Sequence, residues 1–268
     1  MTRMIDGELL SAQGITKRFG GIQALSDVTF SIRNGEIYGL IGPNGAGKTS
    51  LFNVLTGIYA ADAGVFSFDG AALAGLKPHE VAARGIARTF QNIRLFANLS
   101  ALENVMVGRH VRTRATVFGA IFRDARTREE EKAIERRSYE LLEYVGVHKR
   151  ANDLAKHLAY GDQRRLEIAR ALATEPKLLA LDEPAAGMNA TETSTLKQLL
   201  QNIRRDGTTI LLIEHDMKLV MSVCDRVLVL DYGKKIAEGI AGDVQKDPKV
   251  IAAYLGGDVT EHLKNAAA

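Results

Sequence analysis

The chain has 268 residues, of which 46% are hydrophobic and 25% are charged, a composition typical of a globular protein. Its net charge of +3 is too small to favour nucleic acid as a partner. No window approaches about 18 consecutive apolar residues, so no membrane-spanning segment is expected. The first residues lack the pattern of a signal peptide, and Cys224, the one cysteine, excludes an internal disulfide and a cysteine-based zinc cluster. These features favour the cytoplasm.

The first quarter of the chain is rich in predicted strands. Strand character is expected near Leu9–Ile15, Val28–Ile32, Glu36–Ile41 and Gly64–Asp69, with turn residues at Gly20-Gly21, Asn34-Gly35 and Asp69-Gly70. The third of these runs leads directly into the most informative motif of the chain.

That motif is a glycine-rich loop, Gly42-Pro43-Asn44-Gly45-Ala46-Gly47-Lys48-Thr49, which a helical pattern follows. A strand, such a loop and a helix in this order form the context of a phosphate-binding P-loop. Glycines let backbone N–H groups converge on phosphate oxygens, and the helix N-terminus adds positive potential there. Lys48 can reach the β- and γ-phosphates, and the Thr49 hydroxyl suits Mg²⁺. The motif predicts binding of a nucleoside triphosphate; the alternative is a glycine-rich turn before an ordinary helix.

From Pro78 to about Ala173 the sequence favours helices and becomes more charged. The clearest case is Thr127–Gly146, where Ile134, Leu141 and Val145 share one face. The charged run that opens this segment is most simply a solvated helix face. This pattern predicts a helical insertion of roughly 70 residues within an α/β core.

The last hundred residues or so return to α/β patterns. Short apolar runs at Lys177–Leu181, Thr209–Ile213 and Arg226–Leu230 alternate with helical segments, which predicts a parallel sheet covered on both faces. A further strand at Lys234–Glu238 is expected to close a hairpin after the turn at Asp231-Tyr232-Gly233.

Polar residues follow two of these runs. Asp182 and Glu183 end the first run, where one carboxylate can hold Mg²⁺ and the next can orient an attacking water. We assign Asp182 to the metal and Glu183 to the general base. His215 follows the next run, where a donor could reach the γ-phosphate. A lone histidine at a strand end is more often structural, so this assignment depends on its order and spacing after Asp182 and Glu183.

The order of five motifs resembles the ATP-binding subunit of ABC transporters across nearly the whole chain. They are the P-loop, Thr89-Phe90-Gln91-Asn92, Leu158-Ala159-Tyr160-Gly161-Asp162-Gln163-Arg164-Arg165, Leu181-Asp182-Glu183-Pro184 and Glu214-His215-Asp216. The resemblance implies an ATPase with ATP and Mg²⁺, built on an α/β P-loop NTPase core with an antiparallel β subdomain and a helical insertion subdomain. Residues 1–95 and 165–256 would form the core, 96–164 the helical and signature subdomain, and 257–268 a C-terminal tail whose composition favours disorder.

The resemblance also implies roles for single residues. Phe19 would stack on adenine, and Gln91 would sense the γ-phosphate and Mg²⁺ at the contact with a membrane partner. The expected nucleotide-binding residues are Phe19, Gly42, Pro43, Asn44, Gly45, Ala46, Gly47, Lys48, Thr49, Ser50, Ala159, Tyr160, Gly161 and Asp162. The expected metal ligands are Thr49, Gln91 and Asp182, and the expected catalytic residues are Glu183, His215, Gln91 and Lys48.

The segment around Gly161 corresponds to the family's signature sequence. By resemblance it binds the nucleotide of a second ATPase in a head-to-tail dimer, and a glycine at a helix start leaves N–H groups free for that phosphate. The usual pattern is Leu-Ser-Gly-Gly-Gln, but Ala159 replaces the serine, Tyr160 a glycine and Asp162 the glutamine. A lost charge-assisted hydrogen bond is worth about 1.5–3 kcal/mol, so dimer closure is expected to be weaker or to rely more on backbone donors. Asp162 also places a carboxylate near the expected phosphate. Asn189 likewise stands where the family usually has aspartate.

The signature variant, the loop Ala185–Asn189 and the ending Val250–Gly257 look like the ATPases of bacterial importers for branched-chain and other hydrophobic amino acids. This resemblance implies a homodimer or heterodimer of ATPases, two polytopic permease subunits, a periplasmic substrate-binding protein and no nucleic acid. The implied location is peripheral, at the cytoplasmic face of the bacterial inner membrane. The alternatives are the ATPase of urea or amide import or of lipopolysaccharide extraction, and a soluble ABC-type ATPase, which the absence of sustained heptads disfavours.

Overall fold

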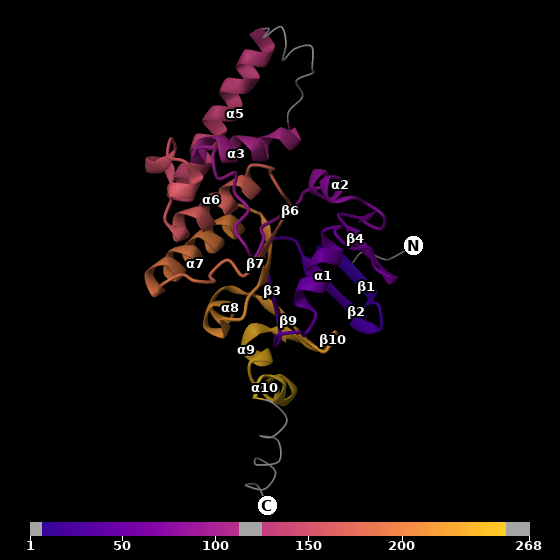
Figure 1. Cartoon of the computed structure of the whole chain (residues 1–268). Coiled ribbons are helices and arrows are strands. Elements are labelled where there is room, and N and C mark those ends of the chain that lie inside the picture. The colour runs from indigo at the N-terminus through magenta and orange to yellow at the C-terminus, as the bar shows by residue number, and fades with distance from the viewer. Residues whose placement is uncertain (1–6, 113–124, 256–268) are drawn as a thin grey trace, which may run out of the picture. The chain divides into compact units, whose positions relative to one another are not determined.

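The computed structural model describes residues 7–112 and 125–255, so the expected tail at 257–268 lies outside the described residues (Figure 1). The chain folds as two compact units. The first unit is Met1–Val81 with Leu200–Ala268, and the second is Ala82–Leu199. The domain boundaries expected after residues 95 and 164 stay a prediction.

The first unit contains a four-stranded antiparallel sheet in the order β2-β1-β4-β5. Its strands are β1 (Glu8–Phe19), β2 (Ile22–Arg33), β4 (Ala63–Phe68) and β5 (Ala71–Ala72). The predicted strands are confirmed, and β1 and β2 are longer than expected. They are longer because their pairing continues to Phe19 and Ile22 at the Gly20-Gly21 turn, beyond the apolar part of either sequence.

Parallel strands form the second part of the first unit. β3 (Ile37–Ile41) pairs in parallel with β8 (Thr209–Ile213) on one side and β9 (Arg226–Asp231) on the other. Every residue of β3 and β8 is buried, which explains their continuous apolar sequences. The predicted hairpin is confirmed, since β10 (Lys234–Ile240) pairs antiparallel with β9. The helices are α1 (Lys48–Leu55), α8 (Met217–Val223), α9 (Ala241–Val244) and α10 (Pro248–Leu255).

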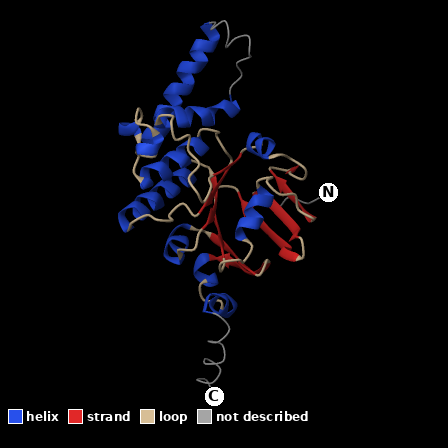
Figure 2. Cartoon of the chain, viewed as in Figure 1, coloured by secondary structure: helices blue, strands red, loops and turns tan. Residues whose placement is uncertain are grey.

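Helices make up most of the second unit, as Figure 2 shows. They are α3 (Ala101–Arg109), α5 (Ala125–Tyr144) and α6 (Tyr160–Leu172), with 3₁₀ turns η1 (His110–Arg112), η2 (His148–Arg150) and η3 (Ala155–His157). The helix predicted at Thr127–Gly146 is confirmed as α5. Helices α2 (Pro78–Ala83) and α7 (Ala190–Arg205) include residues of both units.

The second unit also contains two parallel strands, β6 (Ile86–Arg88) and β7 (Leu178–Asp182). The prediction of a mainly helical segment from Pro78 to about Ala173 is therefore wrong at β6. A strand of this length has no readable periodicity, and it is stabilised by pairing with β7, far along the chain.

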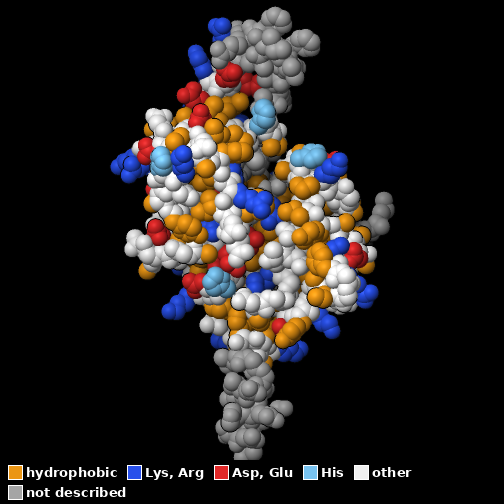
Figure 3. Space-filling view, viewed as in Figure 1, with side chains coloured by type: hydrophobic (Ala, Val, Ile, Leu, Met, Phe, Trp, Pro, Cys, Tyr) orange, Lys and Arg blue, Asp and Glu red, His pale blue; other side chains and the backbone are white. Residues whose placement is uncertain are grey.

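Among the described helices, none is long and apolar enough to cross a membrane. On the face shown in Figure 3, basic and acidic side chains are interspersed.

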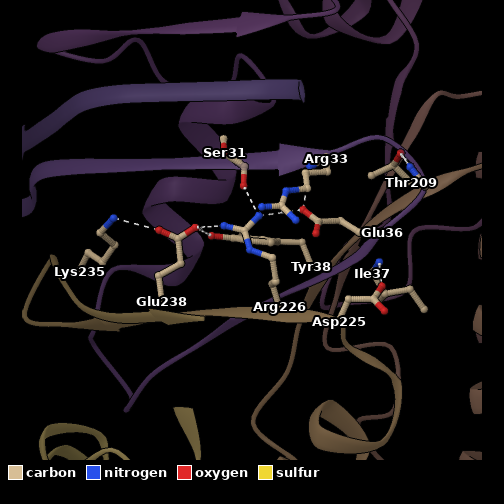
Figure 4. A network of polar contacts seen from close by, with 11 residues as sticks. Ser31, Arg33, Glu36, Ile37, Tyr38, Thr209, Asp225, Arg226, Lys235 and Glu238 are labelled. Carbon is tan, nitrogen blue, oxygen red and sulfur yellow. Dashed lines mark hydrogen bonds and ion pairs between the residues drawn. The ribbon is translucent and has the colours of Figure 1, made fainter. Parts of the chain in front are cut away.

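Arg226, at the start of β9, connects several strands of the first unit (Figure 4). Its Nη1 donates to the Ser31 carbonyl on β2 and to Glu36 Oε1, both at 3.2 Å. Its Nη2 donates to Glu238 Oε1 on β10 at 2.6 Å, and the Tyr38 hydroxyl on β3 donates to the same oxygen at 2.8 Å. Tyr38 is fully buried, and burial, reinforced by the Glu238 charge, raises its pKa well above the ordinary value. The antiparallel sheet and the parallel strands are thus joined through one guanidinium.

We expect Tyr38→Phe to lower the free energy of unfolding by about 1.5–3 kcal/mol at neutral pH, because it removes a buried hydrogen bond to a charged acceptor. Urea denaturation measures this loss. The wild type should also lose stability as the pH rises above about 10, where unfolded tyrosine ionises but folded Tyr38 stays neutral. The variant should lack this part of the pH dependence. Tyr232→Phe, at a side chain 86% exposed, is the control, and an equal loss in both variants would contradict the prediction.

Candidate nucleotide-binding site

The predicted phosphate-binding loop lies between β3 and α1 of the first unit, which confirms the strand–loop–helix order. Gly42, Gly45 and Gly47 have φ angles of +153°, +80° and +101°. Residues with a Cβ rarely adopt such angles, so the backbone of this loop requires glycine at these places. Helix α1 begins at Lys48, immediately after Gly47.

Neighbouring backbone surrounds this loop closely. A Cβ on Gly42 would lie 2.2 Å from the Leu230 carbonyl oxygen, and a Cβ on Gly47 would lie 2.6 Å from that of Ala24. Gly233 N–H donates to the Ala46 carbonyl at 2.9 Å. By contrast, a Cβ on Gly45 would meet no atom within 4 Å. The loop is therefore fixed at both ends by close backbone contact, while its middle faces open space.

Lys48 places its charge inside this loop. Its Nζ donates to the Gly42 carbonyl at 2.7 Å and to the Pro43 carbonyl at 3.0 Å, and the residue is 8% exposed. The first N–H groups of α1 add a partial positive charge at the same end of the loop. Thr49 and Ser50 follow in the first turn of α1, and Thr49 is exposed. This arrangement suits an anion with several oxygens, such as a polyphosphate.

Two other expected residues belong to the same unit. Phe19 ends β1, and its ring is 41% exposed and lies edge-on to Tyr59 with centroids 5.1 Å apart. His215 follows β8 with its side chain 59% exposed, and its Nδ1 lies 3.9 Å from Glu214 Oε2. Both rings are therefore accessible, and their roles at a nucleotide stay predictions.

The second unit brings Gln91 and Glu183 together. Gln91 Nε2 donates to Glu183 Oε2 at 2.9 Å. Glu183 follows β7 with a φ of +47°, a left-handed conformation that is strained for a residue with a Cβ. Asp182, at the end of β7, is 4% exposed, and its N–H donates to the Thr89 hydroxyl at 3.3 Å. The Glu183 carboxylate therefore accepts a glutamine amide just after the end of β7, and the buried Asp182 precedes it in the chain.

The predicted signature segment forms the start of α6. Ala159 is its N-cap residue and provides no side-chain cap. Tyr160, Gly161 and Asp162 form the first turn of the helix. The Asp162 carboxylate is ion-paired with Arg165, which offsets the negative charge that the sequence places beside the expected phosphate. Asn189 caps α7: its Oδ1 accepts from Glu192 N–H at 3.0 Å. An amide accepts this bond as a carboxylate would.

The sequence did not reveal the part that Arg164 plays. Its side chain is 4% exposed and donates to the Phe90 and Gln91 carbonyls and to Tyr160. One signal was present: Arg164 and Glu167 are spaced for an (i, i+3) ion pair, and their charged ends lie 3.6 Å apart. From the sequence alone, however, this pair would be interpreted as a solvent-exposed ion pair on a helix.

A glycine loop around a buried lysine at a helix start, together with acidic residues where a buried strand ends, defines a P-loop nucleoside triphosphatase. Comparison with known proteins narrows this class. The family described as ABC transporter matches residues 25–186, and that described as branched-chain amino acid ATP-binding cassette transporter matches residues 234–260. The chain belongs to the ABC transporter family, as one of its ATP-binding, ATP-hydrolysing members.

Individual relatives agree with this assignment. The chain is 43% identical over 249 residues to the high-affinity branched-chain amino acid transport ATP-binding protein BraF of Pseudomonas aeruginosa, covering 92% of this chain and 98% of BraF. It is 44% identical to LivG of Escherichia coli K12, described in the same words, with the same coverage. The ADP conformation of MJ1267, an ATP-binding cassette of an ABC transporter, superposes with a TM-score of 0.81 at 32% identity, covering 93% of this chain and 99% of MJ1267.

The contacts of the loop glycines lead to a comparison of two substitutions. Gly45→Ala should lower the free energy of unfolding by about 1–2 kcal/mol, the cost of a left-handed alanine. Gly47→Ala should lower it by about 2–5 kcal/mol, because a collision with the Ala24 carbonyl adds to that cost. Denaturant unfolding of both variants measures the difference. Equal losses would show that neighbouring backbone does not constrain the loop at Gly47.

Proposed function

We propose that the chain is the ATP-hydrolysing subunit of an ABC importer for branched-chain or related hydrophobic amino acids. The observation that carries this proposal is the match of residues 234–260 to the branched-chain amino acid family, because this segment lies outside residues 25–186, which the general ABC transporter family matches. The names of BraF and LivG, which are similar over nearly their whole length, support it further.

In the proposed mechanism the first unit binds the nucleotide. Phe19 stacks on adenine, and the N–H groups of residues 42–50 bind phosphate oxygens together with the Lys48 ammonium. Lys48 Nζ now donates to two loop carbonyls, and the γ-phosphate would replace them as its acceptor. His215 donates to the γ-phosphate. The loop N–H groups, Lys48 and His215 stabilise the charge that develops on the phosphate in the transition state.

Most of the hydrolytic groups come from the second unit, and Thr49 comes from the first. Thr49, Gln91 and Asp182 offer hydroxyl, amide and carboxylate oxygens, a donor set that fits Mg²⁺, which would neutralise phosphate charge there. Glu183 acts as the general base that accepts the proton of the attacking water. Its hydrogen bond from Gln91 supports this role, because an amide donor orients the carboxylate in its ionised form.

The signature segment then binds the nucleotide of a second ATPase, identical or different, in a head-to-tail dimer. Ala159 and Tyr160 at the start of α6 are exposed, and Ala159 provides no side-chain cap, which supports this by leaving the first N–H groups of the helix for a γ-phosphate. Dimer closure would drive a conformational change in two polytopic permease subunits. A periplasmic substrate-binding protein would deliver the transported substrate to these permeases. The chain would then work as a peripheral protein at the cytoplasmic face of the bacterial inner membrane.

Purification of the tagged chain from native membranes in mild detergent tests this proposal. We expect two permeases and a second ATPase to copurify, and the purified complex to import branched-chain amino acids into proteoliposomes that contain ATP. Import of urea or amides alone would favour the related importers, and copurification with lipopolysaccharide-transport proteins would favour extraction. A chain that copurifies with no membrane protein would contradict the transport assignment.

Substitution of Glu183 tests the mechanism. We expect Glu183→Gln to lower kcat by at least about a hundredfold, because the amide cannot accept the proton of water. ATP affinity should stay within about twofold of the wild type, and ATP should stabilise the dimer, measured by analytical ultracentrifugation. Glu140→Gln removes a carboxylate from an exposed helical ion pair with Arg137 and serves as the control. Undiminished hydrolysis in Glu183→Gln would exclude Glu183 as the base.

A further inference from the structure

We propose that Arg164 is a positioning residue for Gln91, and that Tyr160 holds the Arg164 side chain in the orientation this requires. The inference rests on the roles proposed above for Gln91 and Glu183. It assigns a task to Tyr160, which stands where the common signature has glycine. All residues concerned belong to the second unit.

The first step is the contact between Arg164 and the Gln91 loop. Arg164 Nη1 donates to the Phe90 carbonyl at 3.0 Å, and Nη2 donates to the Gln91 carbonyl at 2.5 Å. One planar guanidinium thus binds two successive carbonyls of a segment that follows β6 and has no regular secondary structure. Only arginine offers several donors in such a fixed geometry. The backbone of Gln91 therefore depends on the position of this side chain.

The second step is the contact between Tyr160 and Arg164. The Tyr160 hydroxyl accepts from Arg164 Nη2 at 2.8 Å and from Nε at 3.2 Å. On the other side, Glu167 lies 3.6 Å from Arg164 and accepts from the N–H groups of Phe90 and Arg94 at 3.4 and 3.3 Å. The guanidinium is thus bound on both sides, and Tyr160 is the partner that lies on the first turn of α6.

The third step links this group to Glu183. Gln91 donates its side-chain amide to Glu183, so the loop that Arg164 holds also orients the proposed base. The Tyr160 ring packs near the loop after Glu183, since a Cβ on Gly187 would lie 3.2 Å from Tyr160 Cε1. Tyr160 is nevertheless 44% exposed. A ligand on the first turn of α6 would therefore act on Tyr160, the side chain that holds Arg164 against the Gln91 loop.

The competing interpretation is that the buried Arg164–Glu167 pair only stabilises the unit. The two interpretations differ in what Tyr160→Phe should change. The phenylalanine keeps the ring against Gly187 and leaves the ion pair in place, but it loses the oxygen that orients the guanidinium. A structural role predicts a change in thermal stability, whereas a positioning role predicts a change in kcat alone.

The experiment measures steady-state ATP hydrolysis, equilibrium ATP binding and thermal unfolding of the purified full-length chain. For Tyr160→Phe we expect kcat to fall roughly tenfold, equal to about 1.4 kcal/mol of barrier, with ATP affinity and melting temperature unchanged. Arg164→Lys should lower kcat at least as much. The double variant should lose no more than Arg164→Lys alone, because Tyr160 acts through Arg164. Tyr139→Phe, an exposed tyrosine on α5, is the matched control.

A kcat of Tyr160→Phe within twofold of the wild type would overturn the inference. A parallel fall in melting temperature or ATP affinity would also overturn it, in favour of the structural role. If Arg164→Lys does not fold, Tyr160→Phe alone decides the question. Failure of the proposed function gives a different result. The wild type would then hydrolyse no ATP, or it would hydrolyse ATP at a rate that Lys48→Ala leaves unchanged.

Discussion

Close backbone packing around the phosphate-binding loop is the constraint on which the first unit depends. Gly42 lies so close to the Leu230 carbonyl, and Gly47 to the Ala24 carbonyl, that neither position has room for a side chain. These carbonyls belong to β9 and β2, which must therefore be held at fixed positions beside the loop. Arg226 does this, since it binds both β2 and β10 from the start of β9. The shape of the loop is thus a property of several strands.

Sequence reasoning predicted the parts of the fold that local sequence encodes. The buried strand before the loop, the glycines within it and helix α5 each carry their own periodicity or backbone requirement. The strand Ile86–Arg88 was missed, and the length of β1 was underestimated. The strand Ile86–Arg88 depends on pairing with β7, far along the chain. The end of β1 becomes strand by pairing with β2 across the Gly20-Gly21 turn, although its mostly polar sequence carries no signal of that pairing.

In the candidate site, too, features encoded by local sequence could be predicted, whereas contacts between side chains could not. Roles for Lys48, Asp182 and Glu183 could be predicted because phosphate and Mg²⁺ chemistry requires such residues in a recognisable order, and these roles stay predictions. The partners of those residues could not be predicted. Asp162 alone predicts a negative charge beside a phosphate, whereas the structure pairs that carboxylate with Arg165 one helical turn away. Electrostatics at a site depend on such neighbours, which a motif does not specify.

The way Gln91 is held bears on how hydrolysis is controlled. A residue inside a helix or strand cannot move without breaking several backbone hydrogen bonds at once. The carbonyls of Phe90 and Gln91 are instead bound by one side chain, so their release requires only a change at Arg164. Glu183 adds a strained φ of +47° that its surroundings must maintain. A carboxylate kept in place by side chains can be disarranged and restored without unfolding the unit, which would let the proposed base at Glu183 be switched.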